Sequence, residues 1–153
     1  MQLRPLLAKF DTVASFFQSP LLLVIRLYWG ISFAQTGWGK LVNLSRTAGY
    51  FESLNITMPK LNAIMAGSTE CLGGALLALG LFARPAAVPL IGTMFVAYYT
   101  ADREALLAIT SNPDKFVSAA PFLFLLAALI VLVFGPGKLS LDALFGRGPG
   151  AAK

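Results

Sequence analysis

Four long stretches of the chain with almost no charge constrain its fold more than any other feature. They are residues 20–39, 61–82, 85–101 and 116–135. The first contains a single charged residue, Arg26, the second contains only Glu70, and the other two contain none. A helix needs about 20 apolar residues to cross the hydrocarbon core of a bilayer. The pattern therefore predicts four membrane-spanning helices.

The composition supports a membrane location. The chain is 57% hydrophobic and 12% charged, whereas a soluble domain averages about 45–50% apolar and about 25% charged residues. The third stretch is the shortest and begins with Pro85, which a first helical turn tolerates because its amide has no intrahelical partner. A secretory signal peptide is the alternative for the first stretch, but Arg26 interrupts its apolar run and no small-x-small cleavage site follows.

The segments around these stretches complete the predicted fold. Residues 1–19 place apolar side chains at helical spacing, which is typical of an amphipathic helix lying in the membrane interface. In the first loop Tyr50, Phe51 and Leu54 stand near helical spacing and predict a short helix. We expect residues 145–153 to form a flexible tail. The predicted fold class is thus all-α, an integral membrane four-helix bundle over residues 20–144 with these two additional helices.

The distribution of basic residues predicts the orientation. Four spans place both termini on the same side of the membrane. That side holds six Lys and Arg residues and the opposite side holds five. Because cytoplasmic loops carry an excess of Lys and Arg, a multi-pass topology with cytoplasmic termini is favoured.

The residues that the chain lacks exclude several functions. It has no histidine, which excludes imidazole-based haem, zinc, copper and di-iron sites. Its single cysteine, Cys71, excludes an intramolecular disulfide and a CxxC redox couple. We therefore expect neither a metal site nor a cofactor held by the chain alone. The net charge of +5 in a membrane protein indicates contact with anionic lipid, not nucleic acid.

Arg26 and Glu70 are the two charges inside the predicted spans. Such charges cost several kcal/mol and are tolerated when they face the bundle and find partners. Counted from the terminal side, Arg26 lies roughly 9 Å deep and Glu70 roughly 16 Å deep, at about 1.5 Å per residue. An extended arginine covers this offset of roughly 7 Å. The sequence therefore predicts an intramembrane pair of Arg26 and Glu70.

Small and polar residues on the helix faces are expected to support this pair. Small residues let helix backbones approach closely, and polar residues add hydrogen bonds. The supporting residues are Gly30, Gln35, Gly37, Lys40, Gly67, Gly73, Gly74, Arg84, Tyr98, Tyr99 and Asp102. Two interpretations of the pair stay open: a structural staple that sets helix register, or the wall of a polar pocket for a quinone, a small anion or a proton path. No residue is expected to be catalytic.

In their order and spacing these motifs resemble the DoxX family of small bacterial four-helix membrane proteins. The resemblance covers roughly residues 22–144. It rests on R-x3-G-x2-F-x3-G-x2-K from Arg26 to Lys40, on the block from Glu70 through Leu81, and on GPGKLSLD at 135–142.

The resemblance implies a bacterial inner-membrane location and a redox connection. The family takes its name from a membrane subunit of thiosulfate:quinone oxidoreductase, and other members are associated with oxidative-stress and thiol-handling enzymes. Since the chain lacks redox ligands, we expect a non-catalytic anchor or quinone-proximal subunit of a redox or oxidative-stress complex. Its partners would be the lipid bilayer and a soluble or peripheral oxidoreductase, with quinone as the candidate cofactor.

Two other functions and one assembly question stay open. The first function is a transporter or permeability factor for small molecules or anions, with Arg26, Glu70 and Lys40 forming a polar path. The second is a structural assembly protein. A homo-oligomer is compatible with either function and with the redox subunit.

Overall fold

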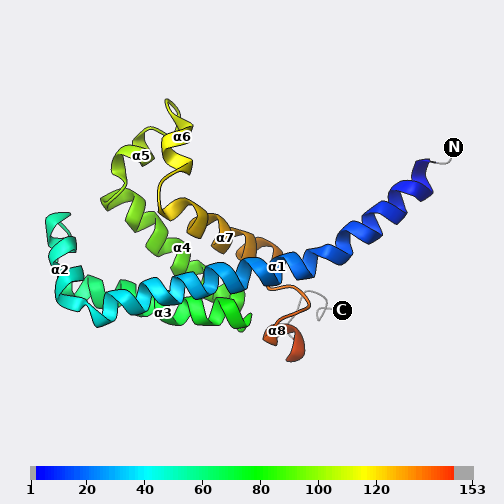
Figure 1. The fold of residues 1–153 in the computed structure, drawn as a ribbon, viewed down its shortest axis with the longest axis horizontal. Coiled ribbons are helices and arrows are strands. Elements are labelled where there is room, and N and C mark those ends of the chain that lie inside the picture. Colours follow the sequence, from blue (N-terminus) through cyan, green and yellow to red (C-terminus); the bar gives the residue numbers. More distant parts are fainter. Residues whose placement is uncertain (1–2, 147–153) are drawn as a thin grey trace.

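The computed structural model describes residues 3–146, and these form helices joined by turns (Figure 1). The helices are α1 (Leu3–Val42), α2 (Leu44–Ser53), α3 (Pro59–Leu79), α4 (Ala83–Thr100), α5 (Arg103–Leu107), α6 (Pro113–Val117), α7 (Pro121–Phe134) and α8 (Leu141–Leu144). The prediction of an all-α fold is confirmed, since no strand occurs between residues 3 and 146. Most of the expected flexible tail, residues 147–153, lies outside the described part of the chain.

Two helices are long and apolar enough to cross a membrane. They are α1, over its residues Leu7–Val42, and α3. The helices at the other two expected spans are shorter than α1 and α3: α4 has 18 residues and α7 has 14. At about 1.5 Å per residue α7 is about 21 Å long, less than a hydrocarbon core of about 30 Å. The count of four membrane spans therefore stays a prediction.

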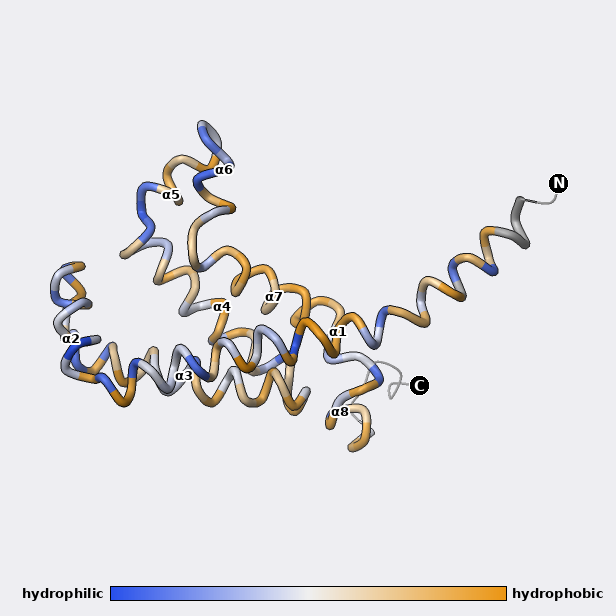
Figure 2. Tube along the Cα trace, viewed as in Figure 1, coloured by the Kyte–Doolittle hydropathy of each residue, from blue (hydrophilic) through white to orange (hydrophobic). Residues whose placement is uncertain are grey.

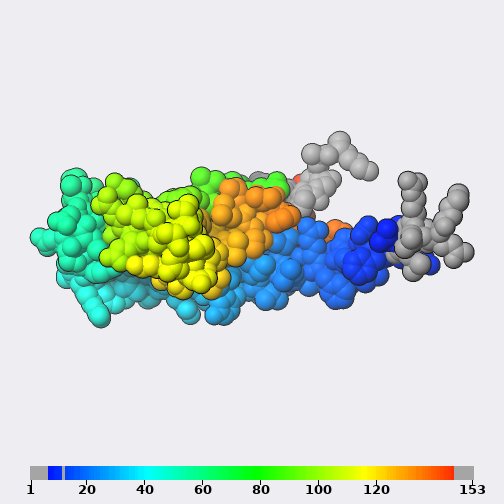
Figure 3. Space-filling view, turned by 90° about the horizontal axis from the view of Figure 1, so that it is seen from above, coloured from blue at the N-terminus to red at the C-terminus, as the bar shows by residue number. Residues whose placement is uncertain are grey.

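The first helix is longer than expected. Instead of a separate interfacial helix before Pro20, residues 3–42 form one continuous helix that contains this proline. Its first part projects beyond the rest of the molecule (Figure 3). There Phe10, Phe16 and Phe17 are exposed. The helix therefore does not break at the expected boundary at residue 19. That its first part lies in the membrane interface stays a prediction.

The fourth expected span begins later than predicted. The short helix α6 ends at Val117, and α7 starts only at Pro121. Proline suits the first position of a helix because it has no amide hydrogen to leave unpaired. The helix ends before Gly135, whose φ of +78° favours glycine. The stretch 116–135 is thus divided by a turn, which hydropathy alone does not reveal.

The long helices pack as two pairs. Helix α3 runs back along α1, and α7 runs back along α4 (Figure 1). The pairs meet near α8 and diverge toward the end that carries α2, α5 and α6 (Figure 1). The buried core lies mainly between α3, α4 and α7 and includes Leu77, Leu90, Tyr98 and Val131.

Apolar side chains cover the outside of the helices. Polar residues gather in α2 and around α5 and α6, whereas the long helices are mostly apolar (Figure 2). More than half of the surface of Leu72, Val88, Phe95 and Val133 is exposed. Soluble monomers rarely expose apolar patches of this kind, whereas a bilayer covers them.

Glycines bring α1 and α3 into backbone contact. A Cβ atom at Gly37 would lie 2.3 Å from the backbone nitrogen of Cys71, and one at Gly74 would lie 2.5 Å from that of Ala34. A Cβ atom at Gly30 would lie 2.6 Å from the backbone nitrogen of Ala78. These contacts set the register of the two helices, and the register decides which side chains meet.

Candidate functional site

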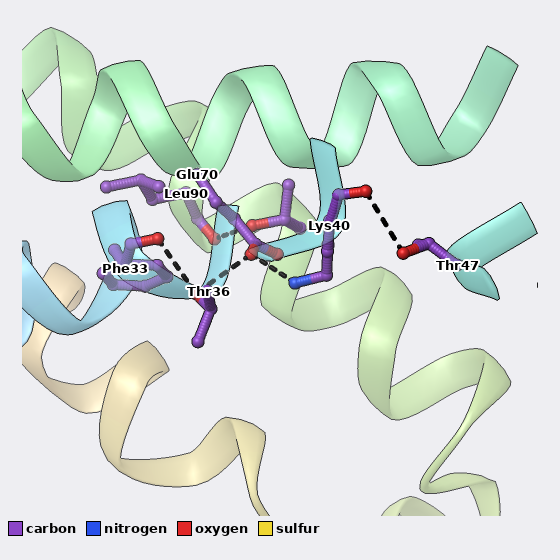
Figure 4. Close-up of polar contacts among 7 residues, drawn as sticks. Phe33, Thr36, Lys40, Thr47, Glu70 and Leu90 are labelled. Atoms are coloured by element: carbon purple, nitrogen blue, oxygen red, sulfur yellow. Dashed lines mark hydrogen bonds and ion pairs between the residues drawn. The ribbon is translucent and has the colours of Figure 1, made fainter. Parts of the chain in front are cut away.

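Glu70 lies buried in the middle of α3 and contacts two side chains of α1. Its Oε2 atom accepts a hydrogen bond from the Lys40 ammonium, and the Thr36 hydroxyl lies 3.2 Å away (Figure 4). Thr36 and Lys40 are four residues apart and so share one face of α1. The Thr36 hydroxyl also lies 2.9 Å from the Phe33 carbonyl oxygen, to which it can donate instead. Glu70 is 4% exposed, whereas the Lys40 side chain is 28% exposed, so the carboxylate is buried and the lysine is partly accessible.

The predicted pair of Arg26 and Glu70 is wrong. Arg26 is fully buried, but its Nη1 atom donates to the Ala78 carbonyl oxygen at 3.3 Å and its Nη2 atom donates to that of Leu139. Ala78 belongs to the last turn of α3, where a positive charge is favourable next to the helix dipole. Within residues 3–146 the Arg26 Nε atom has no hydrogen-bond partner. Arg26 therefore caps the end of α3, and the ion-pair partner of Glu70 is Lys40.

Asp142, which sequence reasoning did not select, lies at the same end of the molecule as Arg26. Its carboxylate accepts hydrogen bonds from the amides of Phe82 at 2.9 Å and Ala83 at 3.0 Å, where α4 begins. Its own amide donates to the Gly80 carbonyl oxygen at 2.9 Å. The segment after α7 is thereby tied to the turn between α3 and α4. The only sequence signal for this was the GPGKLSLD motif that contains Asp142.

A cavity of about 470 Å³ lies between the two helix pairs. Its polar lining includes Thr36, Lys40, Asn62, Thr69, Glu70 and Asp102, and its apolar lining includes Tyr50, Phe51, Leu54, Met65, Met94 and Phe124. Residues of α2 and of the segment after it line one end. The ion pair of Lys40 and Glu70 thus forms a polar patch on a mostly apolar wall.

This ion pair retains hydrogen-bonding capacity toward the cavity. Within the described chain the Glu70 Oε1 atom has no donor, and the Lys40 ammonium donates to Glu70 alone. A lysine ammonium has three N–H donors, and a carboxylate accepts at both oxygens. The pair can therefore donate to one atom of a ligand and accept from another.

The cavity brings together Lys40, Glu70 and Asp102 from the expected set, and the others lie elsewhere. The Tyr98 hydroxyl donates to the Phe116 carbonyl oxygen at 2.8 Å and is buried in the core, whereas Tyr99 is exposed beneath the Arg103 guanidinium. Arg84 donates to the Val133 carbonyl oxygen at 3.2 Å, at the end of α7.

The remaining expected residues are packing residues or face outward. Gly30, Gly37 and Gly74 contact the opposite backbone, as described above. Gly67 packs against Leu41 of α1, and Gly73 packs against Leu90 of α4. Gln35 is exposed and lines a shallow groove between α1 and α3, on which Cys71 also lies.

Comparison with known proteins gives one family. The DoxX family model matches residues 21–103. The chain is 35% identical over 128 residues to the inner membrane protein YphA of Escherichia coli strain K12, a match covering 80% of this chain and 88% of that protein. It is 33% identical over 135 residues to the uncharacterized membrane protein Rv3486 of Mycobacterium tuberculosis strain H37Rv, covering 80% of each. No solved structure matches the chain.

Proposed function

The chain belongs to the DoxX family of membrane proteins, and on this premise we propose that it is a non-catalytic, quinone-binding subunit of an inner-membrane redox complex. The observation that carries the proposal is the cavity with the ion pair of Lys40 and Glu70 on its wall. A site of this kind, mostly apolar with few polar groups, is typical of small-molecule binding.

The chemistry of a quinone matches this cavity. A quinone is uncharged, with carbonyl acceptors on its ring and an apolar tail. The Lys40 ammonium can donate to one carbonyl, and the free Oε1 atom of Glu70 can accept from a hydroxyl of the reduced form. The volume of about 470 Å³ lies within the range of about 300–1,000 Å³ that ligand pockets occupy.

The redox centre would belong to a partner. Residues 3–146 contain no cluster of three or more His, Cys, Asp or Glu side chains placed to hold a metal ion. The chain has no histidine and one cysteine. Electrons exchanged with a bound quinone would therefore come from a soluble or peripheral oxidoreductase, which the chain would hold at the membrane.

In this proposal all four long helices cross the bilayer and both termini are cytoplasmic. Helices α4 and α7 are short for full spans, and the turns at their ends would lie within the interface. The cavity would then lie in the half of the bundle farther from the termini. Arg26 and Asp142 would close the cytoplasmic end through the contacts described above.

The geometry favours binding over transport across the bundle. A transport path was expected to use Arg26 together with Lys40 and Glu70. The lining of the cavity contains Lys40 and Glu70 but not Arg26, which is buried among the carbonyl groups at the end of α3. The described polar residues therefore support a binding site that ends inside the bundle.

Quinone content tests the proposal. Protein purified from membranes in mild detergent should retain about one quinone per chain, measured by solvent extraction and chromatography. Glu70→Gln should lower the affinity for the reduced quinol, measured under anaerobic reducing conditions, by about tenfold or more, because the hydrogen bond from a quinol hydroxyl to the charged carboxylate contributes about 1.5–3 kcal/mol. Glu52→Gln is the matched control, since it removes the same charge from the exposed face of α2. Equal quinol affinity in the wild type and Glu70→Gln would contradict the proposal.

A further inference from the structure

We propose that the cavity receives its ligand sideways from the bilayer and selects molecules with an uncharged head group, while it excludes anionic amphiphiles. This inference rests on the proposed function in one respect, that the cavity around Glu70 is a ligand site. It adds the route of entry and the charge of the ligand.

The lining residues show where the cavity opens. Thr36 of α1, Met65 of α3 and Val96 of α4 line the cavity and are also exposed. Gly92 of α4 lines it too, and a Cβ atom added there would meet no atom within 4 Å. These exposed lining residues belong to both helix pairs, so the cavity is open between the pairs.

These openings face an apolar environment. Around them the outer surfaces of α3, α4 and α7 expose Leu72, Val88, Phe95 and Leu123. In a membrane such surfaces contact acyl chains. A molecule that enters between the pairs must therefore be soluble in the bilayer.

The charges of the lining decide which head group is accepted. The charged lining residues within the described chain are Lys40, Glu70 and Asp102, with a formal sum of −1. The charge of Lys40 is already offset by its contact with Glu70. An anionic head group would meet the second carboxylate and the free Oε1 atom without an unpaired cation. Because charge repulsion is strong in a medium of low dielectric constant, such a ligand is disfavoured.

An uncharged head group can use both partners of the ion pair. The ammonium of Lys40 donates to a carbonyl or hydroxyl oxygen, and Glu70 Oε1 accepts from a hydroxyl. Neither bond requires the ion pair to separate. The site therefore suits a lipid-soluble molecule with a polar, neutral end.

Two probes with the same chain length test the selectivity. Binding of radiolabelled dodecanol and of laurate, which is ionised at pH 8, is measured on immobilised protein in detergent. Wild-type protein should bind dodecanol at least tenfold more tightly than laurate. Gly92→Trp should abolish specific binding by filling the cavity, whereas Gly39→Trp, at a glycine of α1 outside the lining, should retain it.

Charge variants should then change the preference in a defined direction. Glu70→Gln leaves the Lys40 cation unpaired and should raise laurate affinity above that of dodecanol. Asp102→Asn, at the partly exposed rim, should raise laurate affinity without removing the ion pair. Glu52→Gln should change neither affinity. Equal binding of the two probes by wild-type protein would overturn the inference. So would an unchanged preference in both Glu70→Gln and Asp102→Asn.

A third probe separates this inference from the proposed function. Decyl-ubiquinone is added as a competitor of each radiolabelled probe. Quinone binding together with equal laurate and dodecanol binding would overturn the charge selectivity and leave the proposed function standing. Selective dodecanol binding that quinone does not displace would overturn the quinone proposal and support the selectivity.

Discussion

Gly37→Ala is expected to destabilise the protein by about 1–3 kcal/mol or more, the range for overpacking a close contact. The added methyl group would lie 2.3 Å from the backbone nitrogen of Cys71 and 2.6 Å from the carbonyl oxygen of Gly67. Both are main-chain atoms of α3, so no side chain can rotate away and the helices must separate. The measurement is the free energy of unfolding in mixed micelles, supported by the elution profile of the purified protein.

Gly39→Ala is the matched control on the same helix. A Cβ atom at Gly39 would meet no atom within 4 Å, and alanine favours a helix over glycine by roughly 0.5–1 kcal/mol. This variant should therefore be as stable as the wild type or more stable. Equal destabilisation by the two substitutions would contradict the backbone contact between α1 and α3.

Lys40→Met should cost about 2–3 kcal/mol of unfolding free energy, because it leaves the buried Glu70 carboxylate without its cation. The range is set below that of a fully buried pair because the Lys40 side chain is 28% exposed. Glu70→Leu should cost less, since the Lys40 ammonium can reach the membrane surface. The double variant should recover most of the loss of Lys40→Met, since it leaves no unpaired charge.

The control is a second double-mutant cycle, in which Arg26→Met takes the place of Lys40→Met. Arg26 contacts Ala78 and Leu139, not Glu70, so the effects of Arg26→Met and Glu70→Leu should add. Unfolding free energies in detergent provide both cycles. Strong coupling of Glu70 to Arg26, with none to Lys40, would reverse the assignment of partners.

The sequence predicted a partner for Glu70 but selected the wrong cation. Depth along each span, counted from its terminal end, does not contain the axial position of one helix relative to the other. The structure places Gly30 against Ala78 and Gly37 against Cys71. This register sets the first turn after Gly37, with Lys40, beside Glu70, and sets Arg26 beside the end of α3. Register depends on backbone contacts between two helices, which neither hydropathy nor depth contains.

Local features were predicted more reliably than the site. The short helix in the first loop is confirmed as α2, and the all-helical class and the family are confirmed as well. The turn before Pro121 was missed, because residues 118–120 are small or weakly polar and do not interrupt an apolar stretch. A pocket beside Glu70 was one of two open interpretations, but its lining could not be predicted, since its walls come from several helices and depend on how α4 and α7 diverge from the first pair (Figure 1).

Photolabelling tests most directly whether the cavity around Lys40 and Glu70 is a ligand site. A photoactivatable quinone with a short tail is irradiated with the membrane-embedded protein, and the modified residues are mapped by mass spectrometry. Modification is expected at less exposed cavity residues such as Met94 and Phe124, and excess unmodified quinone should prevent it. Modification confined to outward-facing residues such as Leu72 and Val133, and insensitive to the competitor, would contradict it.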